Sequence, residues 1–436
     1  MIVLGFILLL WTLCIFILIS SQAPFLQLLL AGTISFVLAN TLLSLLFLIC
    51  FFAHIPFVFS TAIFIAIPMG YLLLNRKQFL QHFKIPANNH FSSAFLILLL
   101  LILHRFSSDF LAQSNIWGNW DAWAIWSLHA KFLLQEAQFS SMFSESIAWT
   151  HPDYPLMLPG LIALYWKLLG STSPMVPLLI AFGTSLSVLL ICFSSLQQYK
   201  WPILSIFVLY ILIKETVLLP FGSFQYADTL LALFILLSFV CYQFSKEFES
   251  KLLPILTGFF AASCGWIKNE GLLFFLIFVL LYVVINLNKK RNLLLFLSGA
   301  ILPLVLIFYF KLHFDVSSDL FSKEKNVITV KLRDPKRYQE IWDFMYMYVS
   351  TKAQIIFYAL LCALFLRPKY FLSFSFFVLF TVFAGYFFIY VITPNDLNWH
   401  LSTSFDRLLH QISPAIIYTI ALSISKENKK LLLAEH

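Results

Sequence analysis

Long apolar stretches follow one another along almost the whole chain, with short polar segments between them. A membrane-spanning helix needs about 20 consecutive, mainly apolar residues. The shorter segment 157–170 predicts either one more short span or a helix lying in the membrane interface. Because the stretches do not alternate with polar residues, an outer-membrane barrel is excluded. The sequence therefore predicts an all-α polytopic membrane protein with about thirteen spans, at approximately 2–20, 24–47, 50–74, 92–112, 173–195, 201–218, 229–244, 252–266, 271–287, 293–314, 353–366, 370–392 and 408–424.

The composition agrees with a chain that is mostly surrounded by lipid. Of the 436 residues 61% are hydrophobic and 11% are charged, whereas soluble domains carry about 25% charged residues. The six cysteines lie in or beside apolar stretches without zinc-site spacing, so we expect buried thiols. No phosphate-binding loop, dinucleotide fingerprint or nucleophile elbow occurs in the sequence, which argues against nucleotide-driven chemistry.

The basic residues are distributed unevenly between the two sides of the predicted bundle. Six short segments, at 76–84, 200, 246–251, 289–291, 367–369 and 426–430, fall on one side after thirteen crossings. Short loops rich in Lys and Arg face the cytoplasm, which places the N-terminus outside. The basic isoelectric point then reflects topology, and no nucleic-acid partner is expected.

The opposite, non-cytoplasmic side receives the segments that hold most of the unusual polar residues: 113–156, 219–228, 267–271, 315–352 and 393–407. In the first of them Trp120, Trp123 and Trp126 recur every three residues, which predicts one shared face of a short interfacial helix. Asp121 falls on another face and would suit a general base for an incoming hydroxyl. An aromatic belt with a helix-starting Asp is the alternative.

A proline-framed turn, His151-Pro152-Asp153-Tyr154-Pro155, closes the same segment. Two prolines fix an extended backbone, which would aim the His151 and Asp153 side chains in defined directions. Such a turn would supply a pair of metal ligands or a substrate clamp. The alternative is a purely structural role, as a turn that ends this segment before the next helix.

Two further outer segments carry isolated charges next to apolar helices. Asp228 begins a helix, where it would cap the helix end or act as a carboxylate partner of Asp121. With His151, these two acids would suit a divalent metal ion, and a metal-independent site is the alternative. Lys268 and Glu270 interrupt the apolar run from 252 to 287. Charges there indicate a functional site or a tight turn between two spans, and Lys268 would suit a lipid phosphate.

The last outer segment, 393–407, combines His400, Arg407, two acids and three consecutive hydroxyls at 402–404 just before the final span. Arg407 would grip a phosphate with its guanidinium fork, and His400 would donate to the same group or bind a metal. By contrast, the basic stretch 315–339 predicts a solvated loop. Its alternative role is to attract an anionic acceptor or lipid headgroup.

These segments together resemble the GT-C glycosyltransferases. More narrowly, they resemble a bacterial group related to the protein mannosyltransferase and lipid A aminoarabinose transferase families. The resemblance covers most of residues 92–424 and rests on the order and common side of five motifs: WDAWAIW, HPDYPLMLP, YAD, KNEG and PNDLNWHLSTSFDR.

The resemblance implies a polyprenyl-phosphate-sugar donor and a glycan, lipid or protein acceptor of the cell envelope. It also implies a location in the bacterial inner membrane, with the active site facing the periplasm. Asp121 would be the base and Asp228 the later outer acid, while Lys268 and Arg407 would contact the donor phosphate. The other candidate substrate-binding residues are polar and aromatic side chains of the same motifs: Trp120, Trp123, His151, Asp153, Tyr154, Glu270 and His400.

One departure from the family pattern is clear, because about four spans precede Asp121, whereas such enzymes commonly place this acid after the first. Residues 1–91 are therefore interpreted as an N-terminal addition and 92–424 as the catalytic module, followed by a cytoplasmic tail at 425–436. A transporter or flippase for a lipid-linked glycan and a non-catalytic envelope scaffold are the alternative functions. Transporters favour mid-membrane polar groups and internal repeats, which the sequence does not show.

Overall fold

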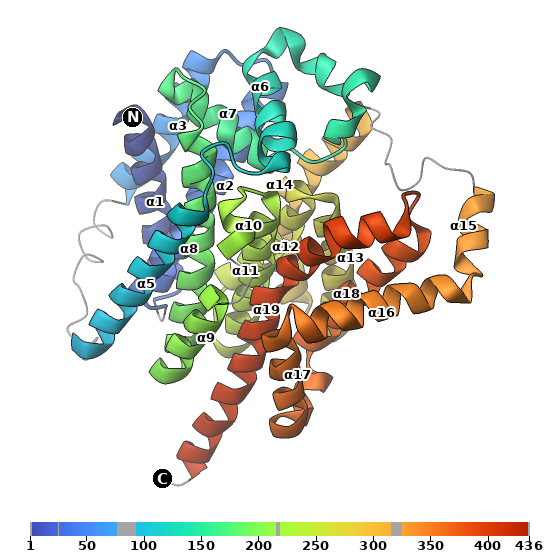
Figure 1. Ribbon diagram of the computed structural model, residues 1–436. Helices are drawn as coiled ribbons and strands as arrows, with labels where there is room; N and C mark the ends of the chain where they lie inside the picture. Colours follow the sequence, from blue (N-terminus) through green and yellow to red (C-terminus); the bar gives the residue numbers. More distant parts are fainter. Residues whose placement is uncertain (1, 25, 76–92, 215–218, 315–324, 435–436) are drawn as a thin grey trace.

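The computed structural model describes residues 2–24, 26–75, 93–214, 219–314 and 325–434, and all regular structure within these ranges is helical. Figure 1 shows a bundle of helices, with two shorter helical arms on the α6 and α15 sides. The principal helices are α1 (Ile2–Gln22), α2 (Leu28–Phe52), α3 (Phe57–Leu74), α5 (Ser93–Gln113), α6 (Leu128–Leu134), α7 (Met157–Leu169), α8 (Met175–Gln197), α9 (Pro202–Lys214), α10 (Leu219–Ser223), α11 (Ala227–Glu247), α12 (Leu252–Ile267), α13 (Asn269–Asn286), α14 (Lys290–His313), α15 (Lys325–Leu332), α16 (Pro335–Thr351), α17 (Gln354–Leu366), α18 (Phe374–Ile392) and α19 (Leu397–Ala434).

The predicted class, an all-α polytopic membrane protein, is confirmed. Ten of the described helices are long and apolar enough to cross a membrane, and the bent pair α16 and α17 would make an eleventh span. Of the remaining predicted spans, α9 and α12 are apolar helices of 13 and 16 residues. Thirteen crossings therefore stay a prediction.

The segment 157–170 forms α7, a mostly buried helix of 13 residues. At 1.5 Å per residue it is about 20 Å long, which is too short for a hydrocarbon core of about 30 Å. The Nζ of Lys167, near its end, lies 2.8 Å from Glu136 Oε1 in the segment 113–156. Both ends of α7 therefore lie at the end of the bundle that carries the segment 113–156, and α7 does not cross the membrane.

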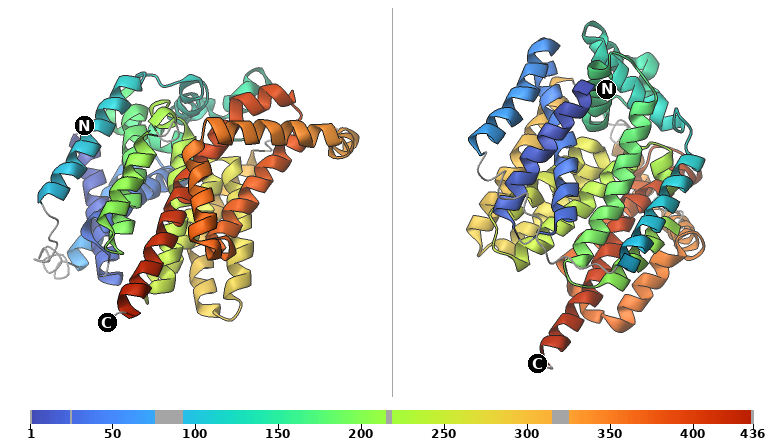
Figure 2. Two further views of the ribbon diagram at one scale, coloured as in Figure 1. Left: turned by 60° about the horizontal axis from the view of Figure 1, so that its bottom comes forward. Right: turned by 90° about the vertical axis from the view of Figure 1, so that its left-hand side faces the viewer.

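Hydrogen bonds at the chain turns define two ends of the bundle. At one end, Tyr199 donates to Glu247 over 2.5 Å, and Ser250 donates to the Gln22 carbonyl over 3.3 Å. Figure 2 (left) shows the C-terminus and the yellow turn between α13 and α14 at this lower end, and the teal segment from 113 onwards at the upper end. These described basic turns therefore share one end, as expected. That this end faces the cytoplasm remains a prediction, and the basic segment 76–84 lies outside the described residues.

The predicted outer loop 315–352 is largely helical where it is described. α16 meets α17 at an angle of 90°, and it presents Trp342 and Tyr346 outward while Ile341 and Met345 are buried. Such an amphipathic helix suits the plane of the interface. The stretch 315–339 was expected to be a solvated loop, whereas its described part forms α15 and the start of α16.

Two basic side chains of this stretch are used structurally. Lys331 Nζ donates to the Thr393 carbonyl over 2.5 Å. Arg337 donates to the carbonyls of Val391 and Tyr390 over 2.7 and 2.9 Å. Cations near a helix C-terminus satisfy its last carbonyls and its dipole, so these residues anchor the end of α18.

The N-terminal helices pack into the bundle. Ser44 of α2 donates to the Met157 carbonyl over 2.8 Å. A Cβ on Gly160 of α7 would lie 2.8 Å from Leu48 of α2, so the glycine permits a close approach of these helices. The interpretation of residues 1–91 as an addition stays a prediction, but α2 also contacts the segment 113–156, because the ring centroids of Phe51 and Phe139 lie 5.0 Å apart.

Candidate functional site

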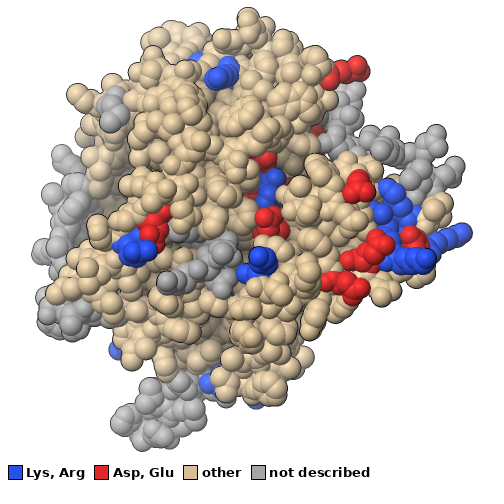
Figure 3. Space-filling view, in the orientation of Figure 1, with Lys and Arg blue, Asp and Glu red and all other residues tan. Residues whose placement is uncertain are grey.

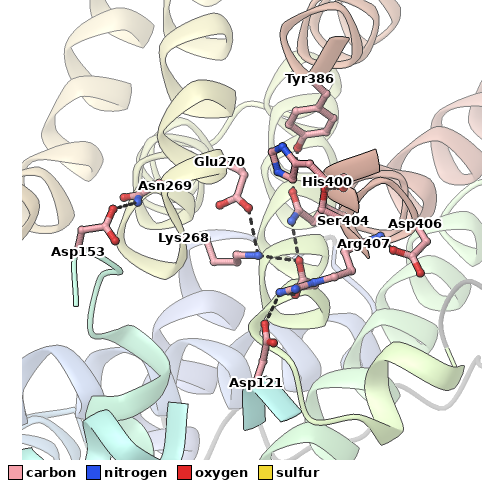
Figure 4. Close-up of polar contacts among 12 residues, drawn as sticks. Asp121, Asp153, Lys268, Asn269, Glu270, Tyr386, His400, Ser404, Asp406 and Arg407 are labelled. Carbon is pink, nitrogen blue, oxygen red and sulfur yellow. Dashed lines mark hydrogen bonds and ion pairs between the residues drawn. The ribbon is translucent and has the colours of Figure 1, made fainter. Parts of the chain in front are cut away.

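Five alternating charges form a chain at the upper end of the bundle. Asp121, Arg407, Asp228, Lys268 and Glu270 follow one another in this order, each paired with the next. They come from four separate parts of the sequence, and Figure 4 shows four of them, Asp121, Arg407, Lys268 and Glu270, pointing toward one another. The chain carries three acids and two bases, so an acid stands at each end.

Asp228 is at the centre of this chain. It lies in the first turn of α11 with none of its surface exposed. Its carboxylate accepts from Lys268 Nζ at 2.9 Å, Gln411 Nε2 at 2.7 Å and Arg407 Nη2 at 3.2 Å. The expectation that Asp228 caps α11 is wrong, because Tyr226 is the N-cap residue. Its alternative partnership with Asp121 takes an indirect form, through Arg407.

Arg407 bridges the two aspartates. Its Nη2 donates to Asp121 Oδ2 over 2.6 Å and to Asp228 Oδ2 over 3.2 Å. The guanidinium carbon also lies 4.9 Å from the ring centroid of Tyr226, a cation–π contact. Burial raises the pKa of Tyr226 to about 12, so its hydroxyl stays neutral at physiological pH. The Nε of Arg407 is buried without a hydrogen-bond partner among the described residues.

Lys268 occupies the sharp corner between α12 and α13. Its backbone is extended (φ −150°, ψ 159°), and its side chain is 2% exposed between Asp228 and Glu270. Gly271 is required by this corner, since a Cβ there would lie 1.9 Å from the Cys264 carbonyl oxygen. The corner confirms a tight turn between two apolar helices, and the turn also places a buried cation in the charge chain.

The proline-framed turn is fixed by a second polar group. Asp153 accepts from Asn269 Nδ2 over 2.7 Å, and Lys311 Nζ donates to the Asp153 carbonyl and to Asn269 Oδ1 over 2.6 and 3.0 Å. His151 has a left-handed backbone (φ 54°, ψ 62°), and its ring stacks 5.0 Å from Tyr154. Such a backbone is strained in a non-glycine residue and persists where the surroundings hold it.

The three tryptophans do not share one face as expected. Trp120 and Trp123 are 45% and 48% exposed with ring centroids 6.0 Å apart, whereas Trp126 is fully buried against Tyr154. The reason is that Ala122–Ser127 is a π-helix. Because a π-helix has more residues per turn than an α-helix, residues three apart fall further short of a full turn and no longer share one face. Asp121 immediately precedes this turn.

A glycine docks this segment on the start of α11. Gly118 has φ 71°, and a Cβ there would lie 2.5 Å from Ala122 Cβ. The next amide, of Asn119, donates to the Phe224 carbonyl over 3.1 Å, and Gln225 Nε2 donates to the Asn115 carbonyl over 2.7 Å. These contacts set where Asp121 lies relative to Asp228.

A cavity of about 500 Å³ opens beside the charge chain. Figure 3 shows red and blue side chains at the bottom of a hollow in the middle of this face. Of the sequence candidates, six line the cavity: Trp120, Asp121, His151, Tyr154, His400 and Arg407. Asp228, Lys268 and Glu270 stand behind Arg407 and are not among its lining residues, and neither are Trp123 and Asp153.

The start of α19 supplies the opposite wall of the cavity, with Asn395 and Trp399 just before and within its first turn. His400 packs edge-on against Tyr390 at 4.9 Å, and its Nδ1 is buried without a partner among the described residues. This wall therefore offers polar side chains to a molecule in the cavity.

The sequence alone assigned no role to Gln411, Tyr226 or Lys311. The signal for Gln411 is helical spacing, because it follows Arg407 by four residues and so shares its face of α19. Polar residues repeating on one face of a membrane helix indicate a buried partner, here Asp228. Tyr226 belongs to the motif YAD, whereas Lys311 carries no comparable signal.

The metal ligands considered above are not gathered around a common point. The guanidinium of Arg407 lies between Asp121 and Asp228, and the His151 ring lies against Tyr154. Among the described residues, no group of three His, Cys, Asp or Glu side chains is arranged to hold a metal ion. Metal dependence stays a prediction.

Comparisons of the chain with protein-family models, with curated proteins and with solved structures gave no match. The GT-C resemblance therefore stays a prediction, and the geometry of the site is the basis for a functional proposal.

Proposed function

We propose that this protein is a membrane glycosyltransferase that transfers a sugar from a polyprenyl-phosphate donor to an envelope glycan, lipid or protein at the periplasmic face. The observation that carries the proposal is the pairing of Asp121 with Arg407 at the wall of one cavity. A carboxylate and a guanidinium facing the same space supply the base and the phosphate contact that this reaction needs.

Arg407 is suited to bind the donor phosphate. Asp228 holds the guanidinium from behind, so the group is positioned before the donor arrives. Its planar fork matches two phosphate oxygens, and its unpartnered Nε adds a donor. As the bond between sugar C1 and phosphate oxygen breaks, its electron pair passes to the phosphate, and the fixed cation stabilises the growing negative charge.

Asp121 is suited to act as the base. The acceptor hydroxyl oxygen forms the new bond to C1 on the face opposite the phosphate, with inversion, and its proton passes to the Asp121 carboxylate. Before the donor binds, the 2.6 Å contact with Arg407 holds this carboxylate in place at the cavity wall. When the donor phosphate competes for Arg407, Asp121 is released toward the cavity. Asp121 is then free to act as the base only when the donor is bound, so it does not accept a proton from an acceptor hydroxyl in the absence of donor.

Lys268 and Glu270 act behind the cavity in this proposal. Lys268 is 2% exposed and already paired with two acids, so it fixes the position of the Asp228 carboxylate, which in turn fixes Arg407. This role differs from the direct phosphate contact that the resemblance implies. In this proposal Arg407 provides the cation beside both aspartates, in the place that a metal ion would take in the metal-dependent alternative.

The aromatic and polar cavity walls are suited to the sugar and the acceptor. Trp120 and Tyr154 present ring surfaces on one side, while Asn395, Trp399 and His400 present hydrogen-bonding groups and a ring on the other. Binding sites for small polar molecules commonly combine such surfaces with a few directed polar groups.

The test is transfer by the purified protein. It is incubated with polyprenyl-phosphate sugars, and the release of polyprenyl phosphate is measured for the wild type, Asp121→Asn and the control Asp343→Asn, whose carboxylate is exposed on α16. We expect turnover that falls about 100-fold or more in Asp121→Asn and is unchanged in the control. Movement of labelled lipid across a bilayer without cleavage of the sugar–phosphate bond would favour the transporter instead.

A further inference from the structure

The first turns of α19 present a second polar face to the cavity of the candidate site. Trp399, Ser402, Thr403 and Asp406 all line this cavity. Their spacing of three, four and seven residues places them on one face of the helix. Arg407 is one residue further on, which rotates its side chain by about 100° around the helix axis. The cavity is therefore bordered by two different faces of α19.

Asp406 supplies a carboxylate to this face. Among the described residues it forms no salt bridge, and its Oδ1 accepts from the backbone amide of Arg407 over 2.8 Å. Asp121, by contrast, is paired with the Arg407 guanidinium at 2.6 Å. Figure 4 shows Asp406 apart from the charge chain. Asp406 therefore keeps carboxylate lone pairs for a molecule in the cavity.

The two hydroxyls on this face also act as hydrogen-bond acceptors toward the cavity. Ser402 Oγ and Thr403 Oγ1 donate to the Trp399 carbonyl over 3.0 and 2.8 Å. A hydroxyl has a single hydrogen, so each of them keeps only its lone pairs for a ligand. An ionised carboxylate likewise has no hydrogen to donate. The ligand of this face must therefore supply the hydrogens.

Trp399 adds an aromatic surface beside these acceptors. Its side chain is 58% exposed. The face of an aromatic ring carries partial negative charge, which attracts polarised C–H groups. A ring beside a carboxylate and two hydroxyls therefore suits a molecule with C–H groups on one surface and hydroxyl groups at its edge. A sugar ring has this arrangement.

The charge on this face restricts the class of ligand further. A phosphate or carboxylate group there would lie beside Asp406, and like charges repel each other. An alkyl chain would remove the carboxylate from water without a hydrogen bond in return, which is unfavourable. A neutral molecule with several hydroxyl groups satisfies all the acceptors of this face, because each hydroxyl donates one hydrogen.

We propose that this face of α19 binds the sugar acceptor, and that the acceptor is a neutral saccharide whose hydroxyls donate to Asp406. The inference rests on the proposed glycosyltransferase function, and it narrows the acceptor from a glycan, lipid or protein to a glycan. Arg407 binds the donor phosphate on the neighbouring face, so adjacent residues of α19 separate the two substrates. Asp406 determines acceptor specificity in this arrangement, and Asp121 remains the base.

The experiment measures saccharide binding without requiring transfer. The labelled full-length protein in nanodiscs is applied to an array of neutral and acidic oligosaccharides, and the affinity for the best-bound member is measured by titration. Asp406→Asn is compared with Asp343→Asn, whose carboxylate is exposed on α16. Thr403→Val is compared with Thr351→Val, because the exposed Thr351 also donates to the carbonyl four residues earlier, that of Met347, over 2.6 Å.

We expect the wild type to bind neutral oligosaccharides. Affinity should fall about tenfold in Asp406→Asn, because hydrogen bonds to a charged group become neutral ones, and about fivefold in Thr403→Val. Both α16 controls should stay within about twofold of the wild type. Binding to acidic members alone, equal affinities of Asp406→Asn and the wild type, or no bound member at all would each overturn the proposal.

A second titration, with sugar-free polyprenyl phosphate, separates this proposal from the glycosyltransferase proposal. Asp406→Asn should bind polyprenyl phosphate no more weakly than the wild type, because the Arg407 guanidinium keeps its contacts, and this binding also shows that the variant is folded. Release of polyprenyl phosphate from the sugar donor without any saccharide binding would overturn the acceptor proposal alone. Saccharide binding that depends on Asp406, without cleavage of the sugar–phosphate bond, would support the saccharide site and overturn the transferase.

Discussion

Replacing Asp121 with Asn should make the protein bind polyprenyl phosphate more tightly while it loses turnover. In the structure Asp121 occupies Arg407 Nη2 at 2.6 Å, with exposed side-chain fractions of 10% and 19%. The donor phosphate must therefore exchange one charge-assisted hydrogen bond for another. An Asn competes through a neutral bond instead, and it leaves the Asp228 contact that positions Arg407 intact.

The size of the effect follows from the two bond classes. A hydrogen bond to a charged group contributes about 1.5–3 kcal/mol and a neutral one about 0.5–1.5 kcal/mol. The difference, about 1–1.5 kcal/mol at this partly screened site, corresponds to roughly 5- to 10-fold tighter binding. The turnover should fall about 100-fold or more, because the base is lost.

The assay is titration of the purified protein in nanodiscs with sugar-free polyprenyl phosphate, with Asp343→Asn as the matched control. About tenfold weaker binding by Asp121→Asn would refute the reasoning, because it would mean that Asp121 holds a cation that in turn binds the phosphate. Unchanged affinity would refute it differently, by showing that the phosphate does not compete for Arg407. A chelator added to the wild type separates these two outcomes.

Four further predictions concern the phosphate contact, the buried charges, the corner between α12 and α13, and the sidedness of the chain. Arg407→Lys keeps the charge but loses the fork, so polyprenyl phosphate affinity should fall about tenfold, and Arg407→Ala should fall further in the same titration. Lys268→Met leaves the buried Asp228 with only Arg407 and Gln411 as partners, which should destabilise the fold by about 3 kcal/mol with little dependence on salt; a thermal unfolding series at low and high salt checks this. Gly271→Ala places a Cβ 1.9 Å from a carbonyl oxygen and should lower the unfolding temperature markedly. In intact cells an impermeant thiol reagent should label Glu340→Cys but not Lys290→Cys, and the reverse labelling would overturn the assigned sidedness.

The sequence was informative where one physical constraint dominates. Backbone groups in lipid must bond within their own segment, so long apolar runs predict helices, and the positions of α2, α8 and α11 follow closely. Outer polar segments also share one end, as the positive-inside pattern indicates. Hence Asp121, Asp228, Lys268 and Arg407 were expected near one another before their contacts were known.

Features that depend on tertiary contacts could not be predicted from the sequence. The π-helical turn after Asp121 rotates Trp126 into the core, and no residue pattern specifies that turn. α7 is as apolar as a span but is held between α2 and the outer segment. Whether Lys268 reaches a ligand or a buried acid depends on the corner with α13, which only the folded chain fixes.

The most direct test of the proposed site is a cryo-electron microscopy map of the purified protein with added polyprenyl phosphate. We expect density for the phosphate in the cavity, within hydrogen-bond distance of the Arg407 guanidinium, with Asp121 turned away from its present 2.6 Å contact. Lipid density elsewhere, with Asp121 and Arg407 still paired at saturating ligand, would contradict the assignment of this cavity as the transfer site.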